Sequence, residues 1–192
     1  MRLWTIQPAE VLDIIRKTGV YRCDTSKSDG IINNGFETAY TYMAEQMRNR
    51  IGPPPPGVDL PVWAWYKWDW QHRRPDMRLT DFKYHAGPHA LIELELPFSE
   101  VLLSDHTTWH IVLNNGYYDD STNEEEFDAN MAAFHALPIA EQESIKHASW
   151  SRIFDITPVE TEWASNGKYV QATFWELKQS NIKQVWEYPK KK

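Results

Sequence analysis

The sequence predicts an α+β fold, and two observations carry that prediction. Segments rich in β-branched and aromatic side chains, the residue types that favour strands, lie near both ends of the chain. Between them, apolar side chains recur at helical spacing in several segments. With 192 residues, of which 42% are hydrophobic and 24% charged, the chain has the size and composition of a single globular domain covering residues 1–192.

Alternation of apolar and polar side chains is clearest in Ala90–Leu96, where Glu93 and Glu95 are expected to face outward. Val101–Leu103 predicts a short continuation of that strand. The last two predicted strands follow each other closely, so we expect a tight turn to join them. The predicted strands span residues 3–7, 62–68, 90–96, 169–177 and 181–188.

Capping residues and apolar stripes predict the helices. Gly19 is expected to end the first helix, and either Ser104 or Asp105 to cap the third. Residues 23–35 are rich in turn formers and predict a loop, and four consecutive prolines end the second helix. The predicted helices span residues of about 9–18, 36–50, 105–113, 122–136 and 139–153.

Six acidic residues crowd the segment Asp119–Asp128. The simplest interpretation is a solvated loop that runs into a helix, because Thr122 and Glu125 have capping-box spacing. A Ca²⁺ site is the alternative, but the EF-hand spacing with its central glycine is missing. The buried stripe of this helix is predicted to consist of Phe127, Met131 and Phe134.

The net charge of −7 argues against attraction to long nucleic acids or to an anionic membrane. No apolar run reaches the roughly 20 residues that a membrane helix needs, and the start of the chain has no signal-peptide core. A single cysteine, Cys23, fits a reducing compartment, so a cytoplasmic location is expected. Residues 189–192 predict a frayed basic tail.

Tryptophan is the most unusual component, with 10 residues in the chain and four between Trp63 and Trp70. From Trp63 to His85 aromatic and basic side chains interleave, which suits stacking on bases and contact with phosphates. Acidic residues offset most of that charge, so a mononucleotide or dinucleotide fits better than a long polyanion. Core packing is the alternative for most of these rings.

Alternation along the tryptophan-rich strand sorts its side chains onto two faces. Trp63 and Trp65 are expected on one face, and Ala64, Tyr66 and Trp68 on the other. We expect the face with Trp63 and Trp65 to border a cleft, because it can pair with Gln7 from the first strand and Glu176 from the late one.

His106 and His110 lie four residues apart and share a helix face, as two zinc ligands could. The general-base glutamate of the zinc-protease motif is absent, and no third ligand is placed by spacing. The sequence therefore predicts no metal site. Packing of one of these imidazoles against Trp109 is the expected alternative.

Several phrases together resemble an uncharacterised bacterial domain family of unknown function, which brings no established activity with it. These phrases span nearly the whole chain: Leu3–Gln7, Pro61–Trp65, Leu103–Asp105 running into Trp109–Asn114, and Gln171–Leu177.

The order of elements is also similar to the ADP-ribosyltransferase-like fold. That resemblance implies a split, mainly antiparallel sheet flanked by helices, with NAD in the cleft of the split. It implies that Gln7 and Arg22 hold the amide and the phosphates of the cofactor. Trp65 or Tyr66 would stack on the nicotinamide, and Glu176 would stabilise the ribosyl cation.

Two positions depart from the pattern of that fold. Thr5 stands where the first strand supplies His or Arg, and Thr173 falls where the late glutamate belongs, unless Glu176 takes that role. The implied catalytic residues are Glu176 and Gln7. The implied cofactor-binding residues are Thr5, Arg22, Trp63, Trp65, Tyr66, Gln171 and Thr173.

Three functions follow from these observations. The first is NAD-dependent ADP-ribosyl transfer, or at least binding of NAD or a related nucleotide. The second is a non-catalytic module that binds a nucleotide or a protein through its tryptophan-rich surface. The third is an RNA-binding protein or a nuclease.

Overall fold

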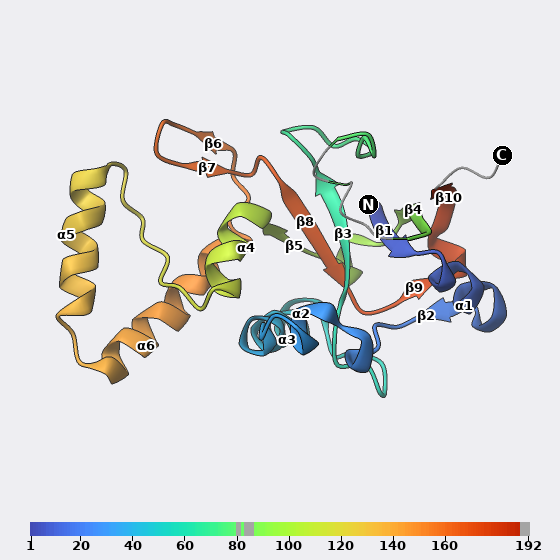
Figure 1. Ribbon diagram of the computed structural model, residues 1–192, viewed down its shortest axis with the longest axis horizontal. Coiled ribbons are helices and arrows are strands. Elements are labelled where there is room, and N and C mark those ends of the chain that lie inside the picture. The colour runs from blue at the N-terminus through green and yellow to red at the C-terminus, as the bar shows by residue number, and fades with distance from the viewer. Residues whose placement is uncertain (80–81, 83–86, 189–192) are drawn as a thin grey trace.

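A computed structural model of the chain describes residues 1–79, 82 and 87–188, with only the backbone described at residues 29–30. The predicted basic tail, residues 189–192, and His85 therefore lie outside the described residues. The fold is α+β, as predicted, and is built on a six-stranded sheet in the order β10-β4-β1-β3-β8-β5 (Figure 1). Its strands are β1 Arg2–Pro8, β3 Val62–Lys67, β4 His89–Glu95, β5 Leu102–Asp105, β8 Val170–Phe174 and β10 Ile182–Tyr188.

Every pairing in this sheet is antiparallel. Two small two-stranded sheets accompany it, one of β2 (Val20–Tyr21) with β9 (Leu177–Lys178) and one of β6 (Val159–Glu160) with β7 (Ser165–Asn166). The helices are α1 Glu10–Thr18, α2 Asp29–Ile32, α3 Glu37–Ile51, α4 His106–Leu113, α5 Glu124–His135 and α6 Ile139–Ser149.

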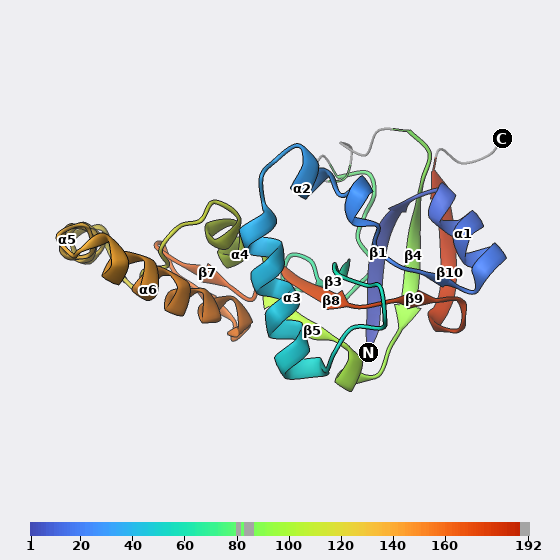
Figure 2. The same ribbon diagram turned by 90° about the horizontal axis from the view of Figure 1, so that it is seen from below.

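Two apolar clusters pack against the sheet. The first joins α1 to the strands through side chains such as Ile15, Leu3 and Ile92. The second joins α3 and α4 to the other end of the sheet through Met43, Trp109 and their neighbours. Figure 2 shows α1 beside β4 and β10, and α3 across β8 and β5. The 3-10 turn Trp150–Phe154 after α6 completes the second cluster with two buried side chains.

The predicted hairpin of residues 169–177 and 181–188 is wrong. β8 lies between β3 and β5, whereas β10 pairs with β4 at the opposite edge of the sheet. The chain leaves the sheet at Trp175, pairs briefly with β2 through β9, and passes the 3-10 turn Gln179–Asn181 before β10 begins. β5 is likewise no continuation of β4, because the turn Phe98–Glu100 carries the chain to the other edge.

Helix α5 differs most from its prediction. None of its side chains is buried, so Phe127, Met131 and Phe134 form no core stripe. Figure 1 shows why: α5 and α6 project from the body of the molecule, and no third layer covers them. The predicted capping box is also shifted by one residue, since Asn123 caps the helix and Glu126 reaches back to Thr122.

No helix in the described part of the chain is both long enough and apolar enough to cross a bilayer.

Gly167 is expected to tolerate no side chain. Its φ is +72°, and a Cβ would lie 2.6 Å from the carbonyl oxygen of Ile156. The left-handed backbone and this contact together should make Gly167→Ala destabilising by about 2 kcal/mol, measured by urea unfolding. Gly57, with φ +77° and open space around it, is the matched control, and Gly57→Ala should cost about 1 kcal/mol. Equal losses for the two variants would show that the contact with Ile156 has no effect.

Candidate functional site

The six-stranded sheet opens between β1 and β3. Along its other side β1 pairs with β4 over seven residues, but towards β3 the two strands share a single register pair, Trp4 with Trp65. Next to that pair, a side-chain hydrogen bond links the two strands: the Thr5 hydroxyl donates to the Trp63 carbonyl at 2.6 Å. A sheet that separates in this way leaves space between its two halves.

A cleft of about 350 Å³ lies at this opening, and we call it the sheet cleft. Five elements of the fold contribute to it, namely β1, β3, β8, α3 and α4. Its walls are formed by Ile6, Tyr40, Trp63, Ala64, Trp65, His106, Trp109, Leu113 and Gln171. Trp63 and Trp65, which alternation placed on one face of β3, both line this cleft, and Ala64, expected on the other face, borders it too.

Flat aromatic surfaces dominate the sheet cleft. The ring of Trp63 lies 5.1 Å from that of Trp109 and 5.8 Å from that of Tyr40, and the ring of Trp65 lies 4.8 Å from that of His106. Among the described residues the buried indole N–H of Trp63 has no acceptor. An unsatisfied buried donor of this kind costs about 1–3 kcal/mol of stability.

Two side chains give the sheet cleft polar character without charge. Burial, and secondarily the nearby His110, lower the pKa of His106 to about 4, so its imidazole is neutral at pH 7. Gln171 is buried and its amide nitrogen donates to the Ser104 hydroxyl at 3.1 Å, which orients the amide. A neutral imidazole offers one donor and one acceptor, and the Gln171 amide oxygen is an acceptor, so the cleft suits an uncharged polar ring.

The low pKa of His106 makes stability depend on pH. Since the pKa falls from 6.5 to about 4 on folding, the unfolded chain binds more protons between these values. Stability contributed by the neutral imidazole is present above pH 6.5 and is lost as the pH falls towards 4. Between pH 7.5 and pH 5 this loss should reach about 2 kcal/mol. Urea unfolding of the wild type and of His106→Gln measures it, and the variant should lose less stability. An identical pH dependence of stability in the two proteins would show that His106 does not cause it.

The residues predicted from the first strand lie on the far side of the sheet. Thr5 pairs with Ile92 and Gln7 with Ala90, so both face the first apolar cluster, and Ile6 faces the sheet cleft instead. The Gln7 amide nitrogen donates to the Thr5 hydroxyl at 2.7 Å. The expectation that Gln7 meets the face of Trp63 and Trp65 is therefore wrong.

Tyr66 also lies outside the sheet cleft. It faces the first cluster, where its ring lies 4.4 Å from that of His72. Trp68 was expected on the face of Tyr66, but a register irregularity after Trp65 turns it back, and its ring lies 4.7 Å from that of Trp65. Thus only one of the two predicted stacking residues, Trp65, reaches the cleft.

Glu176 and Arg22 are brought together, but away from the sheet cleft. The Arg22 guanidinium donates to Glu176 through Nε and Nη2, both at 2.7 Å, and Lys178 lies 3.6 Å away. Glu176 lines a different, smaller cavity of about 180 Å³ beside Trp175. Thr173 is fully buried, and its hydroxyl lies 3.3 Å from the Leu102 carbonyl, so it reaches neither cavity.

Among the ring-bearing side chains of the sheet cleft, sequence reasoning missed three as site residues: His106, Trp109 and Tyr40. The spacing of His106 and His110 was a signal, and their rings do contact each other at 4.6 Å. In the described ranges no three histidine, cysteine or acidic side chains gather as a metal site would require. Tyr40 carried no signal beyond its place in a helical apolar stripe.

A larger cavity, of about 590 Å³, lies at the base of α5 and α6. None of the residues predicted as catalytic or cofactor-binding lines it. We therefore take the sheet cleft as the candidate site for a small ligand and treat the larger cavity separately.

The family described as "Domain of unknown function (DUF3841)" matches residues 2–183, which is most of the chain. The chain belongs to this family, as its resemblance to an uncharacterised domain family predicted. No curated protein and no solved structure matches it.

Proposed function

We propose that this member of the DUF3841 family binds NAD or a related nucleotide, with the planar ring of the ligand in the sheet cleft. The observation that carries the proposal is the place of the cleft: it opens between the first strand and the middle strand of the sheet and is walled by Trp63 and Trp65. An opening at this point supports an ADP-ribosyltransferase-like arrangement. The single cysteine, Cys23, is free, which supports a location in the reducing cytoplasm.

The size of the sheet cleft favours one ring over a whole dinucleotide. At about 350 Å³ it is near the lower end of small-molecule sites, which run from roughly 300 to 1,000 Å³. A nicotinamide or a nucleobase with its ribose fits this space, and the phosphates would then extend to the surface. The ring would stack on Trp65, while Gln171 and His106 would hydrogen-bond to its amide or its polar edge.

We propose binding of the nucleotide and do not assign ADP-ribosyl transfer to this protein. Transfer passes through a cationic ribose that a nearby carboxylate stabilises. None of the residues that line the sheet cleft is acidic. Glu176 is held by Arg22 at another cavity, and both oxygens of the buried Asp105 already accept hydrogen bonds. Binding is therefore the function that the site supports best.

Titration of the intrinsic tryptophan fluorescence with NAD, together with an assay for released nicotinamide, tests this proposal. Saturable quenching without release is the expected result, since three indoles line the sheet cleft. AMP and free nicotinamide, titrated in parallel, identify which ring occupies it. Unchanged fluorescence at millimolar concentrations of all three ligands would refute the proposal, and release of nicotinamide would add the transfer step.

A further inference from the structure

Residues 119–149, which we call the arm, hold a net charge unlike that of the rest of the chain. They contain eight Asp or Glu residues and one lysine, whereas the remaining residues contain 19 acidic and 19 basic side chains. The whole net charge of −7 therefore resides in the arm. Figure 1 shows α5 and α6 extending away from the sheet, and Figure 2 confirms this in the perpendicular view.

The arm also exposes apolar side chains. Phe127, Ile139 and Ile145 are 38%, 73% and 40% exposed, and no residue of α5 is buried. In α6 the one buried side chain is Lys146, which pairs with Glu143 at 2.7 Å. Two helices with so little buried apolar surface gain little stability from each other, because tertiary burial supplies most helix stability in proteins.

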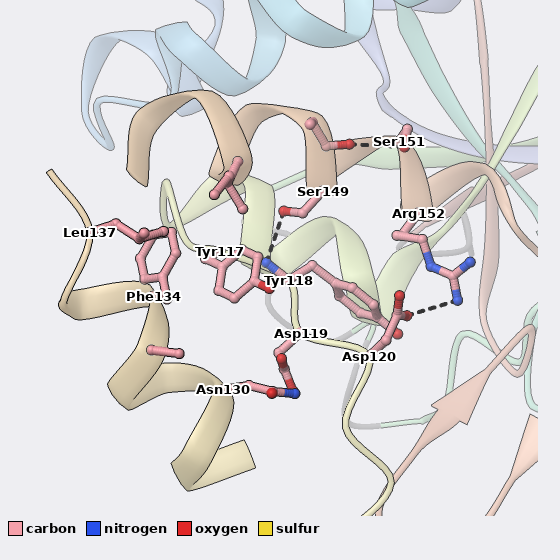
Figure 3. Close-up of a pocket in the computed structure, with 13 residues that line it drawn as sticks. Tyr117, Tyr118, Asp119, Asp120, Asn130, Phe134, Leu137, Ser149, Ser151 and Arg152 are labelled. Atoms are coloured by element: carbon pink, nitrogen blue, oxygen red, sulfur yellow. Dashed lines mark hydrogen bonds and ion pairs between the residues drawn. The ribbon is translucent and has the colours of Figure 1, made fainter. Parts of the chain in front are cut away.

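At the base of the arm lies the cavity of about 590 Å³, which we call the arm pocket (Figure 3). Apolar side chains form its inner wall, including Phe134, whose ring stacks on Tyr117 with centroids 4.4 Å apart and planes 8° apart. Asp119 and Asp120 stand at its other side. The loop that carries them is fixed, because Asp120 pairs with Arg152 at 2.9 Å and the Tyr118 N–H donates to the Ser149 hydroxyl at 3.0 Å.

We propose that the arm docks a cationic amphipathic segment of another protein. One apolar side chain of that segment enters the arm pocket, and its lysines and arginines lie against the acidic residues of the arm. The charge of the arm selects this partner, because opposite potentials attract and steer association. The same charge repels nucleic acids, anionic membranes and a second copy of the arm. The 12 residues of α5 extend about 18 Å, which matches a partner helix of three to four turns.

A fluorescein-labelled peptide of leucine and lysine at helical spacing, four turns long, is the probe. Its anisotropy is measured with increasing protein, and the same peptide with glutamate in place of lysine is the control. We expect saturable binding of the cationic peptide that weakens with salt, and none of the acidic peptide. Failure of the cationic peptide to bind, or equal binding of both peptides, would overturn the proposal.

One variant in the arm pocket and one control outside the arm test where the peptide binds. Ala133→Trp places a bulky ring in the arm pocket from an exposed position on α5, and it should weaken binding by about tenfold. Phe98→Ser removes a side chain that is 74% exposed but outside the arm, and it should leave the affinity unchanged. An equal loss for Phe98→Ser would show that the peptide adheres to any apolar surface and would overturn the proposal.

The contribution of the acidic residues of the arm is tested with a second variant and its control. The triple variant Glu124→Gln, Glu125→Gln and Asp128→Asn should weaken binding by about tenfold, because exposed ion pairs contribute about 0.2–1 kcal/mol each. The control removes three exposed acids outside the arm through Glu10→Gln, Asp59→Asn and Glu100→Gln. Equal effects of the two triple variants would contradict the assignment to the arm. Sedimentation that shows self-association, abolished by Ile139→Ser, would assign the surface to a second copy instead.

Discussion

Replacing Asp105 by alanine is expected to destabilise the fold by about 3–5 kcal/mol, the largest effect on stability that we predict here. The carboxylate is fully buried and accepts three hydrogen bonds. Two come from the N–H and the hydroxyl of Thr108, at 2.8 and 3.0 Å, and one from the N–H of Gly167 at 2.8 Å. Alanine would remove the cap of α4 and leave two backbone donors without partners.

Urea unfolding of Asp105→Ala and Asp105→Asn measures this effect. The asparagine variant keeps one acceptor oxygen in nearly the same volume, so it should lose about half as much stability. Since α4 begins directly after Asp105 and carries His106 and Trp109, the alanine variant should also loosen the sheet cleft. A loss below about 1 kcal/mol for Asp105→Ala would contradict the role of the carboxylate as the anchor of α4.

Replacing Trp65 by alanine is expected to weaken the binding of NAD by about ten- to a hundredfold, because stacking of a ring on an aromatic side chain contributes about 1–3 kcal/mol. The ring is half-buried and contacts those of His106, Trp68 and Phe82. The variant should therefore also lose some stability, but less than the roughly 3–5 kcal/mol typical of a large aromatic side chain in a core.

Fluorescence titration and thermal melts of the same protein separate the two effects. Trp186→Ala is the matched control, because Trp186 is a half-buried indole on β10 that lies outside the sheet cleft. It should bind NAD as the wild type does. If Trp65→Ala kept full affinity, or if Trp186→Ala lost as much, the placement of the ligand ring on Trp65 would be wrong.

Local patterns predicted the longer elements of this fold well, because the physics that forms them is local, but the loop predicted for residues 23–35 contains the short helix α2. Alternation placed Ala90–Leu96 in a strand, and Gly19, with φ +81°, ends α1 as its freedom from a Cβ allows. The order of strands was predicted less well. β10 pairs with β4 across nearly 90 residues of chain, and no pattern within either segment states which partner a strand takes.

The helix α5 shows a second limit. Phe127, Met131 and Phe134 recur at helical spacing, and such a stripe predicts burial whenever another layer covers it. Here no such layer exists, so the same pattern marks an exposed surface. Periodicity alone does not distinguish a stripe that packs against the core from one that awaits a partner.

The candidate site was predicted in part. Alternation within one strand placed Trp63 and Trp65 together, but the face that β1 presents depends on its register with β3, and that register rests on the pair of Trp4 and Trp65. A register moved by one residue would have placed Gln7 in the sheet cleft. Glu176 lies two residues beyond the end of β8, where alternation no longer determines direction.

The most direct test of nucleotide binding in the sheet cleft is the ¹⁵N-indole NMR spectrum during titration with NAD. Tryptophan-to-phenylalanine variants assign the ten indole signals. We predict that the signals of Trp63, Trp65 and Trp109 shift together and saturate at one affinity, while that of Trp186 stays in place. Signals of the three cleft indoles that remain unmoved at saturating NAD, or shifts confined to indoles outside the cleft, would contradict nucleotide binding in the sheet cleft.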